Sequence, residues 1–214
     1  MHKTTTALAT GALGLGFASF ASAQSAPEIY AGGFFDIANA DIDYSDCCSN
    51  RDIDGKHKQL GALLGARFGI GDWVLGGEVD HSRAISNGQY RFASNANACT
   101  ADSDNLCRIN DVTRLKLLIG HNLGNLFLFG TLGANWTNAT ISQLNAAIPV
   151  DVTEQGHSFS IGLETALNEA SSSNARLRLE IIRDYVNFPG VEDPVSYNNA
   201  MSSTTLRAGA IFTF

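Results

Sequence analysis

The chain has 214 residues, of which 16% are charged and 44% hydrophobic, and its formal net charge at pH 7 is −7. That length is enough for one domain. The negative balance argues against nucleic acid as a partner, because binding to phosphates needs a basic face.

Residues 1–23 have the features of a secretory signal peptide. Lys3 supplies a positive start, an apolar stretch follows, and residues 21–23 (Ala-Ser-Ala) form an A-x-A cleavage site. A transmembrane helix is the alternative, but the apolar stretch is short and interrupted by Thr, Gly and Ser. Removing the segment leaves a mature domain, 24–214, that has lost the charge of Lys3, so its net charge is −7 − 1 = −8. No later stretch approaches the roughly 18 apolar residues of a spanning helix, so we expect an exported soluble protein or a membrane β-barrel.

Eight later segments alternate between apolar and polar side chains with a period of two, and none of useful length has the helical period. Each spans about 9–12 residues, which is enough to cross a bilayer at the usual barrel tilt. Ordinary strands average about five or six residues. The predicted strands, in chain order, are 29–38, 59–69, 73–81, 112–121, 126–136, 156–167, 176–186 and 204–214.

One face of each predicted strand is apolar, and the other carries most of the charges. In strand 59–69, Leu60 and Leu64 share a face and Arg67 lies on the other. Strand 126–136 is ambiguous, because its first four residues are all apolar; we place Leu128 and Leu132 outward.

The last predicted strand ends on an aromatic residue. Counting back in twos from Phe214 places Phe212 and Leu206 on one face, while Arg207 points to the other. This pattern is typical of a strand in an outer-membrane barrel, with lipid on one side and a polar interior on the other.

The connections between the strands alternate strictly between short and long. The short ones, 70–72, 122–125 and 168–174, have the composition of tight turns. In outer-membrane barrels, short turns are periplasmic and long loops extracellular, so we expect four extracellular loops. The long connections are polar and rich in Asn, Asp and Ser, and they cover residues 39–58, 82–111, 137–155 and 187–203.

These features, together with the terminal run 211–214 (Ile-Phe-Thr-Phe), resemble the small eight-stranded outer-membrane β-barrel family, the OmpA-like and opacity-type proteins often labelled "porin family". The resemblance covers essentially the whole mature chain. It implies an all-β, eight-stranded antiparallel up-and-down transmembrane β-barrel in the bacterial outer membrane. It also implies contact with outer-membrane lipid and lipopolysaccharide, and recognition of Phe212 and Phe214 by the barrel-assembly machinery. It rests on architecture and not on a catalytic motif, so it implies no activity.

The inward positions bring six acids and six bases into a lumen that is just wide enough to be filled by side chains. Burying such groups unpaired is costly, so we predict an ionic network. Two interpretations stay open: a polar plug that fixes strand register, or a narrow gated pore for small solutes whose ion pairs exchange partners. The predicted lumen residues are Asp36, Arg67, Glu78, Asp80, Arg114, Lys116, Glu164, Arg176, Arg178, Glu180, Asp184 and Arg207.

Four cysteines in an exported chain favour disulfides. Cys47 and Cys48 fall in the first long loop, and Cys99 and Cys107 in the second; three connectivities are open. A zinc site is the alternative, but neither pair has CxxC spacing and no His lies close by. We expect no metal and no cofactor.

The segment 157–160 (His-Ser-Phe-Ser) is the one that invites an enzymatic hypothesis. A nucleophilic Ser needs a His within hydrogen-bond reach. Here His157 falls on one strand face and both serines on the other, so we predict no catalytic residues and no enzyme. The leading hypothesis is a structural or surface-interaction barrel with an unidentified extracellular ligand. The alternatives are the gated porin and a soluble, lipocalin-like barrel, which predicts apolar residues pointing inward.

Overall fold

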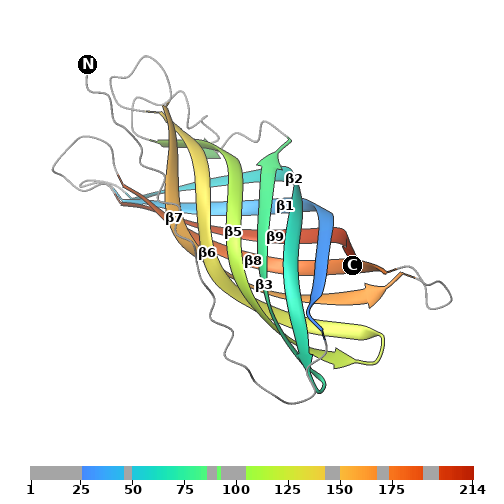
Figure 1. The fold of residues 1–214 in the computed structure, drawn as a ribbon. Helices are drawn as coiled ribbons and strands as arrows, with labels where there is room; N and C mark the ends of the chain where they lie inside the picture. Colours follow the sequence, from blue (N-terminus) through green and yellow to red (C-terminus); the bar gives the residue numbers. More distant parts are fainter. Residues whose placement is uncertain are drawn as a thin grey trace, which may run out of the picture.

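The computed structural model describes residues 26–45, 50–85, 91–92, 105–142, 150–167, 174–189 and 198–214. They form one antiparallel β-barrel of eight long strands, accompanied by a strand of two residues (Figure 1). Within these ranges, no helix is long and apolar enough to cross a membrane. The strands are β1 (Glu28–Ser45), β2 (Asn50–Ile70), β3 (Trp73–Ala84), β4 (Arg91–Phe92), β5 (Asn105–Leu123), β6 (Leu126–Ser142), β7 (Val150–Ala166), β8 (Ala175–Pro189) and β9 (Asn198–Thr213).

The barrel closes because β1 pairs with both β2 and β9. Glu28 lies opposite Arg67 in β2, and Tyr30 lies opposite Thr213 in β9. Every other long strand pairs with its neighbours along the chain, so none of the eight is left as an edge. The short β4 adds two paired positions to β2. The predicted fold class, an eight-stranded antiparallel up-and-down barrel, is confirmed.

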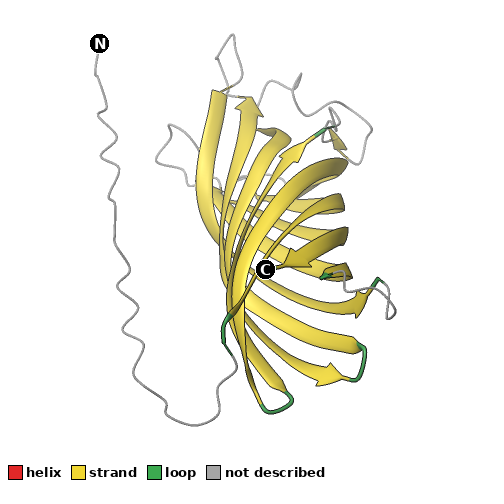
Figure 2. Cartoon of the chain, turned by 45° about the vertical axis from the view of Figure 1, so that its right-hand side comes forward, coloured by secondary structure: helices red, strands yellow, loops and turns green. Residues whose placement is uncertain are grey.

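Two of the predicted tight turns lie at one end of the barrel, which we call the turn end; the opposite end is the loop end (Figure 2). Gly71 has a φ of 62° in the β2–β3 turn, and Gly124 has a φ of 63° in the β5–β6 turn. Glycine takes this left-handed conformation without steric cost, which is why it occupies both turns. The third predicted turn, 168–174, lies outside the described residues except for its last position.

The strands are longer than predicted at the loop end. β2 begins at Asn50 and β5 at Asn105, so much of the predicted loops 39–58 and 82–111 is paired strand. The prediction followed the alternation of apolar and polar residues, which weakens there. Backbone pairing nevertheless continues, for example between Asp43 and Asp52. The described strands therefore extend beyond the segment that has an apolar outer face.

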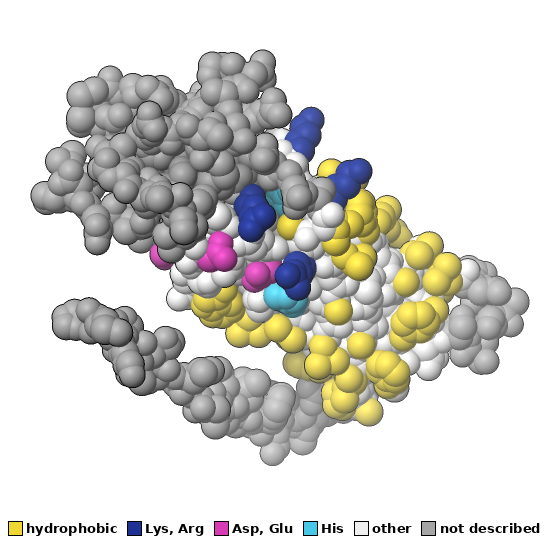
Figure 3. All heavy atoms as spheres, turned by 90° about the horizontal axis from the view of Figure 1, so that it is seen from above, with side chains coloured by type: hydrophobic (Ala, Val, Ile, Leu, Met, Phe, Trp, Pro, Cys, Tyr) yellow, Lys and Arg dark blue, Asp and Glu magenta, His cyan; other side chains and the backbone are white. Residues whose placement is uncertain are grey.

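The barrel changes polarity along its length. Toward the turn end the outer face is apolar and the interior charged, and Figure 3 shows hydrophobic side chains gathered on that outer surface. Toward the loop end the arrangement reverses: Lys56, Arg108 and Asp151 are exposed outside. The interior there holds a buried group that we call the upper apolar cluster, formed by Ala40, Ile109, Val112, Ala139, Ile141, Val186, Phe188 and Met201.

Candidate functional site

All twelve predicted lumen residues point into the barrel. Eleven of them are at most 4% exposed, and Arg176, near the turn end, is the half-buried one. Successive side chains of a strand face opposite sides, so placing one charge inward fixes the direction of every second residue. We call the ion pairs among these residues, together with Glu28, the lumen network.

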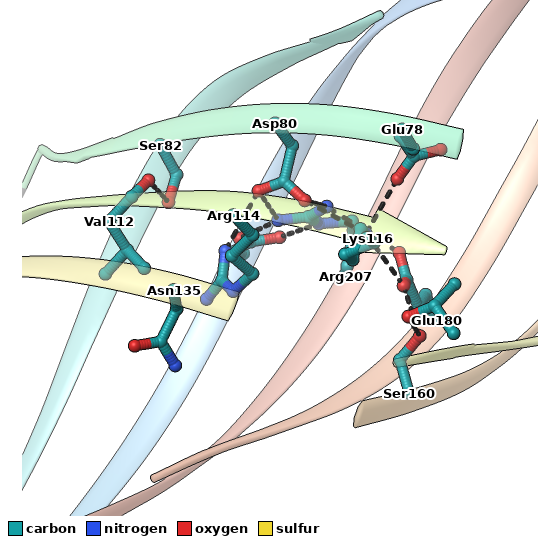
Figure 4. Close-up of polar contacts among 12 residues, drawn as sticks. Glu78, Asp80, Ser82, Val112, Arg114, Lys116, Asn135, Ser160, Glu180 and Arg207 are labelled. Carbon is teal, nitrogen blue, oxygen red and sulfur yellow. Dashed lines mark hydrogen bonds and ion pairs between the residues drawn. The ribbon is translucent and has the colours of Figure 1, made fainter. Parts of the chain in front are cut away.

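Lys116 lies at the centre of the lumen network. Its Nζ is 2.7 Å from Glu78 Oε1, 2.9 Å from Asp80 Oδ2 and 3.1 Å from Glu180 Oε1. The acids come from two elements, β3 and β8, on different sides of the lumen (Figure 4). A single buried ammonium thus pairs with and connects three buried carboxylates.

Two arginines extend the network toward the loop end through Asp80. Arg114 Nη1 and Arg207 Nη1 lie 3.0 and 3.1 Å from the Asp80 carboxylate. Arg114 also grips Asp184 with Nε and Nη2, at 3.1 and 2.7 Å. Arg207 grips Asp36 in the same way, at 2.9 and 3.0 Å. These two-pronged contacts use the planar guanidinium fork and are the stronger form of charge-assisted hydrogen bond.

Two more arginines extend the network toward the turn end through Glu164. Arg178 donates to Glu164 Oε1 from Nε at 3.0 Å and from Nη2 at 2.7 Å, and it also pairs with Glu78. Arg67 Nη1 lies 2.7 Å from Glu164 Oε2. On its other side, Arg67 Nη2 lies 2.5 Å from Glu28 Oε1. Glu28 was missed because the predicted first strand began one residue later.

The ion pairs are of two geometric kinds. Some join residues directly opposite each other on neighbouring strands, as Glu78 and Lys116 are on β3 and β5. Others span the lumen between strands that are not neighbours, as Arg114 of β5 and Asp184 of β8 do. Pairs of the first kind favour one register between neighbours, and pairs of the second kind hold opposite walls together.

Aromatic rings lie against three of the lumen arginines, an arrangement that the sequence did not reveal. Arg207 Cζ is 3.5 Å from the centroid of Phe34, and Arg178 Cζ is 4.7 Å from that of Phe129. Arg67 has Tyr30 and Phe127 nearby, at 4.9 and 5.0 Å. A desolvated guanidinium over a ring is a favourable cation–π contact. It also explains why β6 begins with apolar residues on both faces: the leucines face outward, and the phenylalanines support arginines.

Neutral polar groups complete the hydrogen bonding of the buried acids. Tyr30 donates its hydroxyl to Glu78 Oε2 at 3.0 Å, and Ser160 donates to Glu180 Oε1 at 2.5 Å. Asn135 Nδ2 donates to Asp184 Oδ1 at 3.1 Å. Buried carboxylates need such donors once their charges are paired.

The segment 157–160 has the geometry predicted for it. Ser158 and Ser160 are buried inside the barrel, whereas His157 is exposed and stacks on Tyr185, with ring centroids 5.2 Å apart. Among the described residues, Ser158 Oγ has no hydrogen-bond partner at all. No nucleophile–base pair is therefore assembled from this segment.

Several predicted features lie outside the described residues. These are residues 1–23 and the cysteines Cys47, Cys48 and Cys99, so the disulfide pairing stays a prediction. Cys107 does not lie in a loop as predicted, because β5 already begins at Asn105. At the carboxy terminus, Phe212 is 52% exposed on β9, and Phe214 is 81% exposed and donates its backbone N–H to the Ile29 carbonyl at 2.9 Å.

No family model and no curated protein matches the chain. Solved structures of outer-membrane barrels do. The strand pairing by itself makes the chain an eight-stranded closed barrel, so the predicted architecture is confirmed. The chain is similar to Neisserial surface protein A, with 12% identity over 90% of this chain and 100% of that one, at a TM-score of 0.48.

Two further structures have comparable scores. The outer membrane protein OprG from Pseudomonas aeruginosa has 15% identity over 89% of this chain and 97% of that one, at a TM-score of 0.48. The outer membrane protease OmpT from Escherichia coli has 9% identity over 87% of this chain and 97% of that one, at 0.44. Similarities at this level carry no argument about the chain.

Proposed function

We propose that the chain is an integral outer-membrane β-barrel with a structural and surface-interaction role, and that its lumen is sealed. The observation that carries this proposal is the apolar outer surface at the level of the lumen network. Leu117 is 73% exposed there, Ile161 68% and Leu132 63%. Water-soluble proteins rarely expose contiguous apolar surface of this kind, whereas a barrel in lipid requires it.

The soluble, lipocalin-like hypothesis fits this surface poorly. A soluble binding barrel would keep apolar side chains inside for its ligand and charged ones outside. Toward the turn end the arrangement is the opposite, with Arg178 and Glu164 buried and Leu179 half exposed. Burying paired charges while exposing leucines is favourable only if the outer solvent is hydrocarbon.

Two parts of the interior, the lumen network and the upper apolar cluster, favour a sealed lumen over a conducting one. In the lumen network, Asp80 contacts Lys116, Arg114 and Arg207, so a passing solute would have to break several buried ion pairs. Breaking one such pair costs about 3–5 kcal/mol. The upper apolar cluster lies beyond it, toward the loop end, and adds buried apolar side chains to the interior there.

A gated, narrow porin remains the second candidate because of Lys116. An ammonium with three carboxylates within 3.1 Å can give up one partner and keep the others. Such an exchange of partners would let a pore open without leaving Lys116 unpaired. Single-channel recording in planar bilayers separates the two candidates: reproducible conductance steps above the empty-bilayer baseline would favour the porin.

Residues at the loop-end border of the apolar surface support contact with lipid head groups. Trp136 and Tyr185 are 37% and 36% exposed, as expected of an aromatic girdle. Arg183 faces outward beside Tyr185, with its Cζ 5.4 Å from the ring, and donates to Ser202 at 2.8 Å. A guanidinium held at this level suits the phosphates of lipopolysaccharide.

Other partners follow from the two ends of the barrel. The barrel-assembly machinery would recognise the exposed Phe212 and Phe214. The strand extensions and the four connections at the loop end would face the cell exterior and meet an extracellular ligand. With an even strand count, both termini lie at the turn end, which would face the periplasm.

Gel mobility tests the central proposal. The protein is extracted from the outer-membrane fraction with detergent and run with and without boiling. A closed barrel that resists the gel detergent migrates faster before boiling. Recovery in the soluble fraction without a heat-dependent shift would overturn the membrane assignment.

A further inference from the structure

A cavity of about 310 Å³ opens at the turn end of the lumen, and we call it the turn-end cavity. It lies at the turn-end margin of the lumen network, and four of the ten described residues that line it have charged or amide side chains. The residues that matter to the argument are Glu28, Arg67, Asn122, Phe127 and Arg176. Under the proposed orientation the cavity would face the periplasm.

Among the bases, Arg176 makes the weakest contact with the lumen network. Its Nε lies 3.5 Å from Glu164 Oε2, beyond good hydrogen-bond distance, and that buried nitrogen has no hydrogen-bond partner in the described structure. Glu164 is already paired with Arg67 and Arg178, each at 2.7 Å. If Arg176 bound another anion instead, Glu164 would therefore still be paired.

A second guanidinium is fixed beside it. Arg67 is held by Glu28 and Glu164 and lies between the rings of Tyr30 and Phe127. Three of its five N–H groups make these bonds, so two have no partner among the described residues. Asn122, exposed at the end of β5, adds amide donors to the same wall.

We propose that the turn-end cavity binds a small oxyanion, a carboxylate or a phosphate, with Arg176 as the main contact. The fork of an arginine matches two oxygens of either group. Arg67 and Asn122 supply further donors, and the cavity volume admits only a small molecule. The site goes beyond the structural role proposed above and does not depend on it.

Glu28 sets the strength of this site. Its side chain is 41% exposed, and it accepts hydrogen bonds from both Nε and Nη2 of Arg67. As an anion in the same cavity, it competes with an incoming oxyanion for Arg67. Neutralising Glu28 should therefore strengthen binding, whereas neutralising Arg176 should weaken it.

The test titrates the folded, detergent-solubilised barrel with sodium phosphate and, separately, with sodium acetate. Sodium chloride at equal ionic strength is the reference. NMR follows the Nε–H signal of Arg176 and the side-chain amide of Asn122. We expect saturable shifts of both with at least one of the two anions, and the comparison shows whether phosphate or carboxylate is preferred. Arg176→Gln should weaken binding at least about tenfold, the loss of a charge-assisted hydrogen-bond pair.

Three further variants make the result specific. Glu28→Gln should tighten binding by about threefold or more, because an opposing charge is removed. Arg83→Gln, which removes an exposed arginine from the outer face of β3, should bind as the unaltered protein does. Arg176→Lys keeps the charge without the fork, and it replaces Arg176→Gln if that variant fails to fold; it too should bind more weakly.

The proposal is overturned if neither anion gives a saturable shift beyond that of chloride. It is equally overturned if the Arg176 variant binds as tightly as the unaltered protein. The membrane assignment is tested separately by gel mobility, so the two proposals can fail independently.

Discussion

Replacing Lys116 with methionine tests whether the lumen network stabilises the barrel. The substitution keeps an unbranched side chain but removes the ammonium that contacts Glu78, Asp80 and Glu180. Glu78 keeps Arg178, and Asp80 keeps Arg114 and Arg207. Among the described residues, Glu180 keeps the distant Arg207, at 3.6 Å, and the hydroxyl of Ser160. The cost is therefore concentrated on one buried carboxylate.

Leaving one buried charge without its partner lowers the free energy of unfolding by about 3–5 kcal/mol. We expect Lys116→Met to lose an amount in that range. The double variant Lys116→Met/Glu180→Gln removes the stranded charge as well, so it should recover more than about half of the loss. Lys56→Met, at an exposed lysine on the outer face of β2, should change stability by less than about 0.5 kcal/mol.

The assay is urea unfolding of the barrel in lipid vesicles, read by tryptophan fluorescence and by gel mobility without boiling, with linear extrapolation to zero urea. The reasoning is refuted if Lys116→Met costs less than about 1 kcal/mol. It is also refuted if the single and the double variant are equally unstable, because Glu180 would then not be the group that the ammonium stabilises.

Three other substitutions probe separate features. Leu117→Arg should cost about 2–4 kcal/mol in vesicles if the residue faces the bilayer midplane, but almost nothing in a soluble barrel; urea unfolding distinguishes these outcomes. Gly156→Ala places a Cβ in steric conflict with the Tyr185 carbonyl oxygen, so it should cost about 1–3 kcal/mol or block closure. Gly77→Ala, whose nearest contact is 3.8 Å away, should leave the heat-dependent gel shift unchanged. Phe34→Leu removes the ring beneath Arg207 and should lower the free energy of unfolding by about 1–2 kcal/mol in the same assay. No measurable change would mean that the cation–π contact does not stabilise the barrel.

The turn-end half of the barrel could be predicted because two patterns agree there: the alternation of side chains and the pairing of charges across neighbouring strands. Alternation placed Arg67 inward and Leu64 outward, and the structure has them buried and 54% exposed, respectively. Neighbouring-strand pairs such as Asp36 and Arg207 also follow from the register once the barrel is known to close between β1 and β9. Periodicity and charge balance are properties of the sequence, whereas closure is seen in the structure.

The contacts across the lumen could not be predicted, because they depend on the tilt and diameter of the closed barrel. Nothing in the sequence pairs Arg114 with Asp184, which lie on β5 and β8 with β6 and β7 between them. The loop-end extensions were missed for a different reason. There the outer face carries polar and charged residues, so Asp41, for example, breaks the apolar pattern without ending the strand.

The reversal of polarity along the barrel also affects how its outer surface can change. Near the loop end, the strands are held by backbone pairing and by the upper apolar cluster, as in a water-soluble barrel. Their outward side chains, such as Arg108 and Asn187, face away from that core. A substitution at these positions alters neither the lipid-facing surface nor the buried ion pairs. The loop-end strands therefore form a hydrogen-bonded sheet. Its outward residues can change with little effect on the part of the barrel that would lie in the membrane.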